Sequence, residues 1–100
     1  MSAAKTEALK LINENGVVVF SKSTCPFCTA TKKLLNEVGA QYKVLELDQE
    51  KAIQDALQEI TGQRTVPNIF IGQKHIGGNS DLQAIKDQLP ALIQAAGPKA

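Results

Sequence analysis

The chain has 100 residues, 43% of them hydrophobic, and its charged side chains nearly cancel to a formal net charge of +1. This length suits one hydrophobic core, so we expect residues 1–100 to form a single domain. A charge so close to zero gives no electrostatic reason to expect nucleic acid or a membrane surface as a partner. No apolar run approaches the roughly 18 residues of a membrane span, and the first residues lack the core of a signal peptide. We therefore expect a soluble, cytoplasmic protein, in which two cysteines indicate catalysis rather than a permanent bridge.

The start of the chain predicts a helix followed by a buried strand. Residues 2–15 carry a modest apolar stripe at helical spacing, and Gly16 is placed as a C-terminal stop. Residues 17–20 read Val-Val-Val-Phe, and three β-branched side chains in an apolar run of four predict a strand inside a core. The small polar residues that follow, 21–24, predict a loop.

A second helix is predicted to open at Cys25-Pro26 and to end at Gly39. Proline is tolerated in a first helical turn because the amide that it lacks would have no partner there. Helical spacing predicts one buried face, made of Phe27, Ala30, Thr31, Leu34, Leu35 and Val38. Cys25 is thereby placed at or just before the helix N-terminus, facing unpaired amides and the positive end of the helix dipole. That setting favours a thiolate over a thiol.

Cys28 falls on the same side of this helix as Cys25, so a disulfide between the two is sterically plausible. One interpretation is a structural staple. Closing a loop this short stabilises a fold by only about 2 kcal/mol, against about 3 kcal/mol for a loop of about 15 residues. The other interpretation is a redox-active dithiol, which a Cys-x-x-Cys pair directly after a predicted strand favours. We therefore take Cys25 and Cys28 as the candidate catalytic residues.

Further strands and helices are predicted in the second half of the chain. Residues 41–47 predict a strand, and the order strand, helix, strand implies a parallel pair joined by a right-handed crossover. A third helix is expected to open at Asp48 and to end at Gly62. Residues 68–71 and 75–76, joined by a turn that contains glycine, predict an antiparallel hairpin.

The last quarter of the chain predicts two more helices. Gly77-Gly78 is expected to break the preceding strand, and Asn79 or Ser80 can cap the next helix. The inner face of that helix is predicted to hold Leu82, Ile85 and Leu89. Pro90 is expected to begin a final short helix. Together the elements predict one α/β domain without repeats or linkers.

Three motifs together resemble those of a classical dithiol glutaredoxin: Cys25-Pro26-Phe27-Cys28, Thr65-Val66-Pro67, and Gly77-Gly78-Asn79-Ser80-Asp81. The similarity covers nearly the whole chain, about residues 8–89. It implies a thioredoxin-like fold, a four-stranded mixed sheet with helices on both faces, which agrees with the predicted order of elements. It also implies an electron-transferring, glutathione-dependent thiol–disulfide oxidoreductase that reduces protein–glutathione mixed disulfides and protein disulfides. We expect glutathione as the reducing co-substrate, no metal, and a monomer.

Glutathione carries two carboxylates and one ammonium group, so its site needs cations and free amides on one side and a carboxylate on the other. Lys22, together with Arg64 or Gln63, is a candidate for the glycine carboxylate. Thr24, beside the first cysteine, is a further candidate contact.

The resemblance also places the rest of the glutathione site. It sets the backbone of Val66 against the cysteinyl part of glutathione and makes Pro67 a cis residue beside the active-site sulfur. From the residues alone, a trans proline that starts a strand is the alternative. Gly78 and the amides of Ser80 and Asp81 are expected at the γ-glutamyl carboxylate, with the Asp81 side chain at its ammonium group. Simple capping of a helix is the alternative for these residues.

One residue departs from the family pattern, and three rival functions remain. Phe27 stands where the commonest motif has Tyr, so any contact that this hydroxyl would make with glutathione is lost, whereas the thiol chemistry is not affected. A thioredoxin would have Trp before the motif and Gly-Pro within it, and the chain has no Trp. An iron–sulfur carrier shared between two subunits is disfavoured by Pro26. A zinc site is poorly supported, because two cysteines and the distant His75 do not make four ligands.

Overall fold

The computed structural model describes residues 2–97. Its strands are β1 (Val17–Ser21), β2 (Lys43–Glu46), β3 (Asn68–Ile71) and β4 (Lys74–Gly77). Its helices are α1 (Ala3–Glu14), α2 (Pro26–Glu37), α3 (Lys51–Thr61), α4 (Asn79–Ala84) and α5 (Leu89–Ala96), with a 3₁₀ turn η1 (Lys86–Gln88) between the last two.

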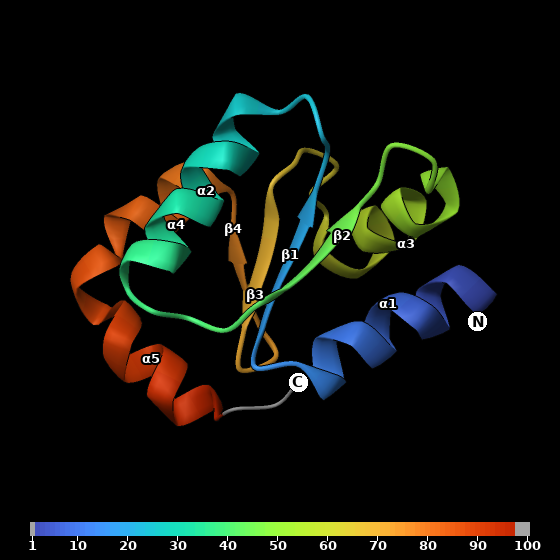
Figure 1. The fold of residues 1–100 in the computed structure, drawn as a ribbon. Helices are drawn as coiled ribbons and strands as arrows, with labels where there is room; N and C mark the ends of the chain where they lie inside the picture. Colours follow the sequence, from blue (N-terminus) through green and yellow to red (C-terminus); the bar gives the residue numbers. More distant parts are fainter. Residues whose placement is uncertain (1, 98–100) are drawn as a thin grey trace.

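The strands form one mixed sheet in the order β2-β1-β3-β4. β1 pairs in parallel with β2 and antiparallel with β3, and β3 pairs antiparallel with β4. Helices α1 and α3 cover one face of the sheet, and α2, α4 and α5 cover the other (Figure 1). The predicted four-stranded mixed sheet with helices on both faces is confirmed.

The central strand β1 is buried on both faces, which explains its unbroken apolar sequence. Side chains alternate across a strand. Val18 and Phe20 therefore pack against α1 and α3, whereas Val17 and Val19 pack against α2, α4 and α5. Phe20 meets Phe70 of β3 edge to face, with ring centroids 5.9 Å apart. The sheet thus separates two cores, and β1 contributes to both.

The sheet topology brings two loops to the same edge. β1 ends at Ser21, and a turn closed by the Cys25 amide donating to the Lys22 carbonyl (3.1 Å) leads into α2. β3 runs the opposite way and starts at Asn68, which is paired with Phe20 near the end of β1. The loop before β3 therefore lies beside the start of α2.

The third helix does not begin where the sequence predicts. α3 starts at Lys51, not at Asp48. The Asp48 carboxylate instead accepts hydrogen bonds from the amide (3.1 Å) and the hydroxyl (2.7 Å) of Ser23. Asp48, which the sequence predicts as the start of this helix, therefore binds the loop that contains Ser23, 25 residues earlier in the chain, instead of capping the helix.

The predicted helix through Leu82, Ile85 and Leu89 is interrupted. α4 ends at Ala84, Ile85 leaves helical geometry, and Leu89 is the first residue of α5. Only Leu82 and Leu89 are fully buried. The helix predicted up to Leu89 is therefore α4 followed by η1, and the final helix predicted from Pro90 is α5, which begins one residue earlier.

Two smaller boundaries also differ. The strand predicted over residues 41–47 is limited to β2, and Gly77 is the last residue of β4 rather than a break in it. Gly77 has φ of 118°, which side chains rarely adopt, so the strand can end in a sharp change of direction. In the described part of the chain, no helix has the length and apolar character of a membrane span.

Candidate active site

Cys25 is the N-cap residue of α2, as the proline after it predicts. Its backbone is extended, and its sulfur accepts a hydrogen bond from the Cys28 amide at 3.1 Å. The thiol also points at the Val66 carbonyl oxygen, 3.7 Å from Sγ. Cys25 is half-buried, so it is more accessible from outside than a core residue.

Cys28, one turn into the helix, is completely buried. Burial, followed by a hydrogen bond with the Cys25 side chain, raises the pKa of the Cys28 thiol above its ordinary value. The Ser21 side chain and the Lys22 backbone lower the same pKa and offset only part of that rise. Cys28 is therefore held as a neutral thiol, away from the exterior.

The loop before β3 lies against the exposed sulfur. The Val66–Pro67 peptide bond is cis, as the resemblance implied, and Pro67 is buried. Gln63 holds this loop, because its side-chain nitrogen donates to the carbonyl oxygens of Thr65 and Pro67, both at 3.0 Å. Gln63 was predicted as a ligand contact; in this structure its side-chain nitrogen makes these two hydrogen bonds within the loop.

A groove of about 420 Å³ opens next to this loop. It is lined by Phe27, Thr65, Val66, Pro67, Gly78, Asn79 and Ser80. The groove thus unites the first helical turn of α2, the cis-proline loop and the start of α4. Thr65 and Asn79 also line it; both belong to the family motifs, but neither was predicted to contact glutathione.

Phe27 corrects the predicted buried face of α2. Its side chain is 65% exposed and is the one large exposed hydrophobic side chain of the described residues. Helical spacing assigns it to the core, but the first turn of α2 stands at the rim of the groove, beyond the core residues Leu34 and Leu35.

The start of α4 depends on Asp81 and on the absence of a side chain at Gly77. One Asp81 carboxylate oxygen accepts the Gly78 amide at 2.9 Å, which is one half of a capping box. A Cβ at Gly77 would collide with that carboxylate. Gly77 is therefore needed both for its positive φ and for the position of Asp81. The Gly-Gly pair was interpreted from the sequence as a strand break and as part of a family motif, but the room that Gly77 makes for Asp81 was not predicted.

Three other residues were predicted to contact glutathione: Lys22, Thr24 and Arg64. Lys22 and Thr24 belong to the loop that leads into Cys25, so they are near the sulfur in sequence and in space. Arg64 turns away: its guanidinium donates to Asp55 of α3 at 2.7 Å and to Gln58 at 2.9 Å. The Arg64 hydrogen bond is the main reason why the pKa of Asp55 is lowered.

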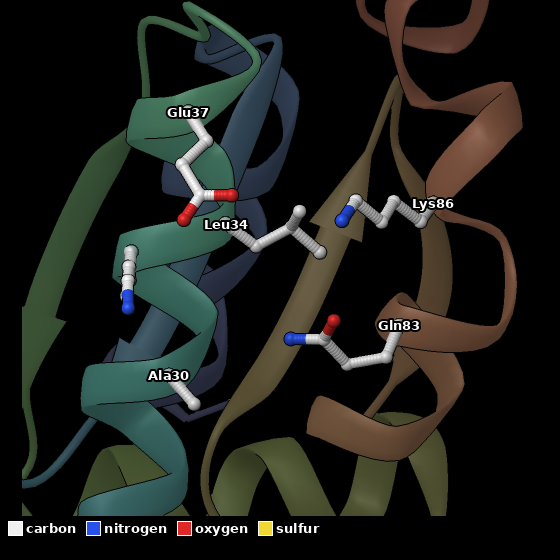
Figure 2. A pocket seen from close by; sticks show the side chains of 6 residues that line it. Ala30, Leu34, Glu37, Gln83 and Lys86 are labelled. Atoms are coloured by element: carbon white, nitrogen blue, oxygen red, sulfur yellow. The ribbon is translucent and has the colours of Figure 1, made fainter.

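A smaller hollow of about 240 Å³ lies between α2 and the segment from α4 to η1 (Figure 2). Leu34 points into it, with Glu37 on one side and Gln83 and Lys86 on the other. It shares no lining residue with the groove, so the two are separate. Within residues 2–97, no three histidine, cysteine or acidic side chains gather as a metal site would require.

Comparisons with known proteins agree with this geometry. The family model named Glutaredoxin matches residues 17–76. Glutaredoxins of Vernicia fordii and Ricinus communis are 50% and 54% identical to the chain; the alignments cover 97% and 94% of it and 99% and 97% of the relatives. The chain belongs to the glutaredoxin family.

The solved structures place this glutaredoxin on the thioredoxin-like α/β fold. A buckwheat glutaredoxin–glutathione complex superposes with a TM-score of 0.89 at 45% identity, covering 97% of this chain and 93% of the other. Glutaredoxins are glutathione-dependent thiol–disulfide oxidoreductases, and this chain is an enzyme of that class. The predicted family, fold and enzyme class are confirmed.

Proposed function

We propose that this glutaredoxin reduces protein–glutathione mixed disulfides through Cys25 alone and protein disulfides through Cys25 and Cys28 together. The observation that carries this proposal is the unequal exposure of the two sulfurs. Cys25 is half-buried beside the groove, whereas Cys28 is completely buried and its thiol pKa is raised. A disulfide sulfur that arrives from outside meets only Cys25.

The position of Cys25 suits both halves of the reaction. In the first half, its thiolate attacks the glutathione sulfur of the mixed disulfide and releases the protein thiol. In the second half, another glutathione attacks the glutathione sulfur of the resulting adduct, and Cys25 leaves as a thiolate. The Cys28 amide that donates to the Cys25 sulfur would stabilise negative charge on this sulfur, both before it attacks and when it leaves.

The groove is the proposed site for glutathione, supported by the glutathione complex of the buckwheat relative. The backbone of Val66 beside Pro67 can pair with the cysteinyl part, which lies next to the Cys25 sulfur. At the other end, Gly78 and the amide of Ser80 line the groove where a carboxylate would fit.

Charged groups at the two ends of the groove would fix its direction. The Asp81 amide lies at the start of α4, and its carboxylate is proposed to hold the ammonium group of the γ-glutamyl part. At the other end, Lys22 is the preferred partner for the glycine carboxylate, with Thr24 beside it. Arg64 and Gln63 remain candidates, but each would first have to leave the hydrogen bonds it makes in this structure.

We also propose that the enzyme acts as a monomer, since one chain supplies both sulfurs and the whole lining of the groove. Sedimentation of the reduced protein with glutathione should show one species of the monomer mass. A stable dimer would contradict this part of the proposal.

Cysteine-to-serine variants test the function directly. Cys25→Ser should lose all activity. Cys28→Ser should keep, or even raise, the removal of glutathione from proteins, because the internal disulfide can no longer form. The same variant should lose most reduction of protein disulfides that needs both thiols. If Cys28→Ser were inactive on glutathionylated proteins, the assignment of that reaction to Cys25 alone would be wrong.

A further inference from the structure

A buried hydroxyl links the helix that carries the cysteines to the segment at the opposite wall of the groove. Thr31 lies three residues after Cys28 on the buried face of α2, and it is completely buried. Its hydroxyl donates to the side-chain oxygen of Asn79, the first residue of α4, at 3.0 Å. Among residues 2–97, no other hydrogen bond joins α2 to α4. This contact is therefore the one directional link between the two helices.

The Asn79 side chain is held from both helices. Its oxygen accepts a second hydrogen bond, at 3.2 Å, from the side-chain nitrogen of Gln83, one turn further along α4. An amide carbonyl oxygen has two acceptor positions, and both are filled here. Gln83 faces α2 across the hollow between the two helices (Figure 2). Thr31 from α2 and Gln83 from α4 thus fix the same atom.

The two ends of this link belong to the two parts of the proposed glutathione site. α2 carries Cys25 as its N-cap residue. Asn79 lies between Gly78 and Ser80, and all three line the groove. In the proposed function, Cys25 meets the sulfur of glutathione, whereas Gly78 and Ser80 meet its γ-glutamyl carboxylate. The hydrogen bond between Thr31 and Asn79 therefore joins the segments that hold the two ends of one ligand.

Apolar packing between the helices does not by itself fix this spacing. Leu34 and Leu35 of α2 and Leu82 of α4 belong to the same core. Burial of apolar surface is non-directional, so it holds the helices together without selecting one position along their contact. A hydrogen bond depends on distance and angle, and a buried hydroxyl without a partner is costly. The Thr31 hydroxyl therefore favours the arrangement in which Asn79 lies opposite to it.

We propose that Thr31 and Asn79 are positioning residues that set the spacing between Cys25 and the γ-glutamyl end of the groove. The inference rests on the proposed glutathione site and adds two residues that were not assigned to it. Thr31 is completely buried, so it cannot touch a ligand and has to act through Asn79. The consequence is selectivity. A disulfide that contains glutathione uses both ends of the groove, whereas a disulfide of a small thiol uses only Cys25.

The test compares two mixed disulfides of one peptide, one with glutathione and one with 2-mercaptoethanol. Reduced protein in excess is mixed with each, the reaction is quenched with acid at short times, and the loss of the mixed disulfide is followed by chromatography. The ratio of the two second-order rate constants measures the selectivity for the glutathione part. The native protein should react faster with the glutathione disulfide.

Thr31→Val keeps nearly the same side-chain shape but has no hydroxyl. Its rate constant for the glutathione disulfide should fall roughly three- to tenfold, and that for the mercaptoethanol disulfide should stay within about twofold, because only the first depends on this hydrogen bond. Thr31→Ser is the matched control, since it removes the methyl group and keeps the hydroxyl. It should lose stability in urea and keep the native selectivity. The two variants separate an effect on stability from the loss of the hydrogen bond.

Asn79→Ala completes a double-variant cycle. It removes the acceptor, and the Thr31 hydroxyl can then bond to a backbone carbonyl one turn earlier in its own helix. Asn79→Ala should lose selectivity. Adding Thr31→Val to this variant should change the selectivity no further, because Thr31 acts only through Asn79.

Native selectivity in Thr31→Val, or the same loss of selectivity in Thr31→Ser, would overturn the inference. An equal loss of rate on both disulfides would also overturn it, as would a full effect of Thr31→Val in the Asn79→Ala background. A native protein that shows no preference for the glutathione disulfide would instead overturn the proposed glutathione site, so the two failures are distinguishable.

Discussion

The two sides of Cys25 are built in different ways. On the side of β2, side chains bond to one another: Asp48 holds Ser23, and Lys32 holds Glu46. On the side of α4, the groove is lined by a backbone turn, small residues and an exposed aromatic ring. On the β2 side, these polar side chains are therefore bound to one another. On the α4 side, the groove has space for a ligand and backbone groups that can bind it.

This difference explains how one short motif can be both fixed and accessible. Ser21 at the end of β1 bonds to Glu46 of β2, and Ser23 in the next loop bonds to Asp48 just after β2, so the chain before Cys25 has a defined position before substrate arrives. The groove contributes little to holding the sulfur and can therefore exchange ligands. Substitutions on the groove side should change substrate binding, and substitutions on the β2 side should change the position or stability of the loop.

The largest effect is expected for Gly77→Ala. The new Cβ would collide with the Asp81 carboxylate, and the backbone there has φ of 118°. Gly39→Ala is the control, because Gly39 has φ of 74° but open space around it. The control should lose roughly 1–2 kcal/mol of unfolding free energy in urea, and Gly77→Ala clearly more. Gly77→Ala should also raise the KM for a glutathionylated substrate about tenfold or more; equal results for the two variants would contradict the close approach.

A smaller effect, on binding alone, is expected for Asp81→Asn. Loss of a charge-assisted hydrogen bond of roughly 1.5–3 kcal/mol should raise the KM for glutathionylated substrate at least several-fold. Asp87→Asn removes the same charge from the exposed η1 turn and should leave KM unchanged. If Asp81→Asn behaved like its control, Asp81 would be only the cap of α4.

On the β2 side, Asp48→Asn should change the pH dependence of stability rather than KM. The Ser23 hydroxyl and amide hold the pKa of Asp48 below its ordinary value of 3.8. A carboxyl with a lowered pKa in the folded state stabilises the fold above its unfolded pKa, and this stabilisation is lost as pH falls through the folded pKa. The urea midpoint of the native protein should therefore drop below pH 4 by more than that of Asp48→Asn. Parallel curves for the two proteins would mean that the contact with Ser23 is not maintained in solution.

The smallest effect is expected for Phe27→Tyr, which restores the commoner residue of the motif. Phe27 is 65% exposed at the groove rim, so an added hydroxyl enters water without displacing a neighbour. Stability should stay within about 0.5 kcal/mol, as for most surface changes, and KM should change by less than about threefold. A larger fall in KM would show that the hydroxyl has a partner on the ligand.

The sequence alone determined the parts of the protein that depend on local spacing. Three β-branched residues before a polar loop predict β1 because they suit a strand buried on both faces. Pro26 predicts the first turn of α2 because its missing amide and its fixed φ fit that position, and Cys25 is the N-cap as a consequence. The order strand, helix, strand gave the parallel pair of β1 and β2. The motifs of the glycine-rich and cis-proline loops indicated the family before any geometry was available.

Only the tertiary structure decided which side chains meet across the fold. Nothing in the spacing around Asp48 indicates that its partner is Ser23 rather than its own helix, and nothing near Arg64 shows that Asp55 will hold it. Phe27 fits the helical stripe and is nevertheless exposed, because burial depends on what another element places opposite it. Local spacing and short motifs therefore predicted most of the helices and strands and the two reactive cysteines. The partners of the loop side chains lie far away in sequence, so they depend on which elements the fold brings next to each loop.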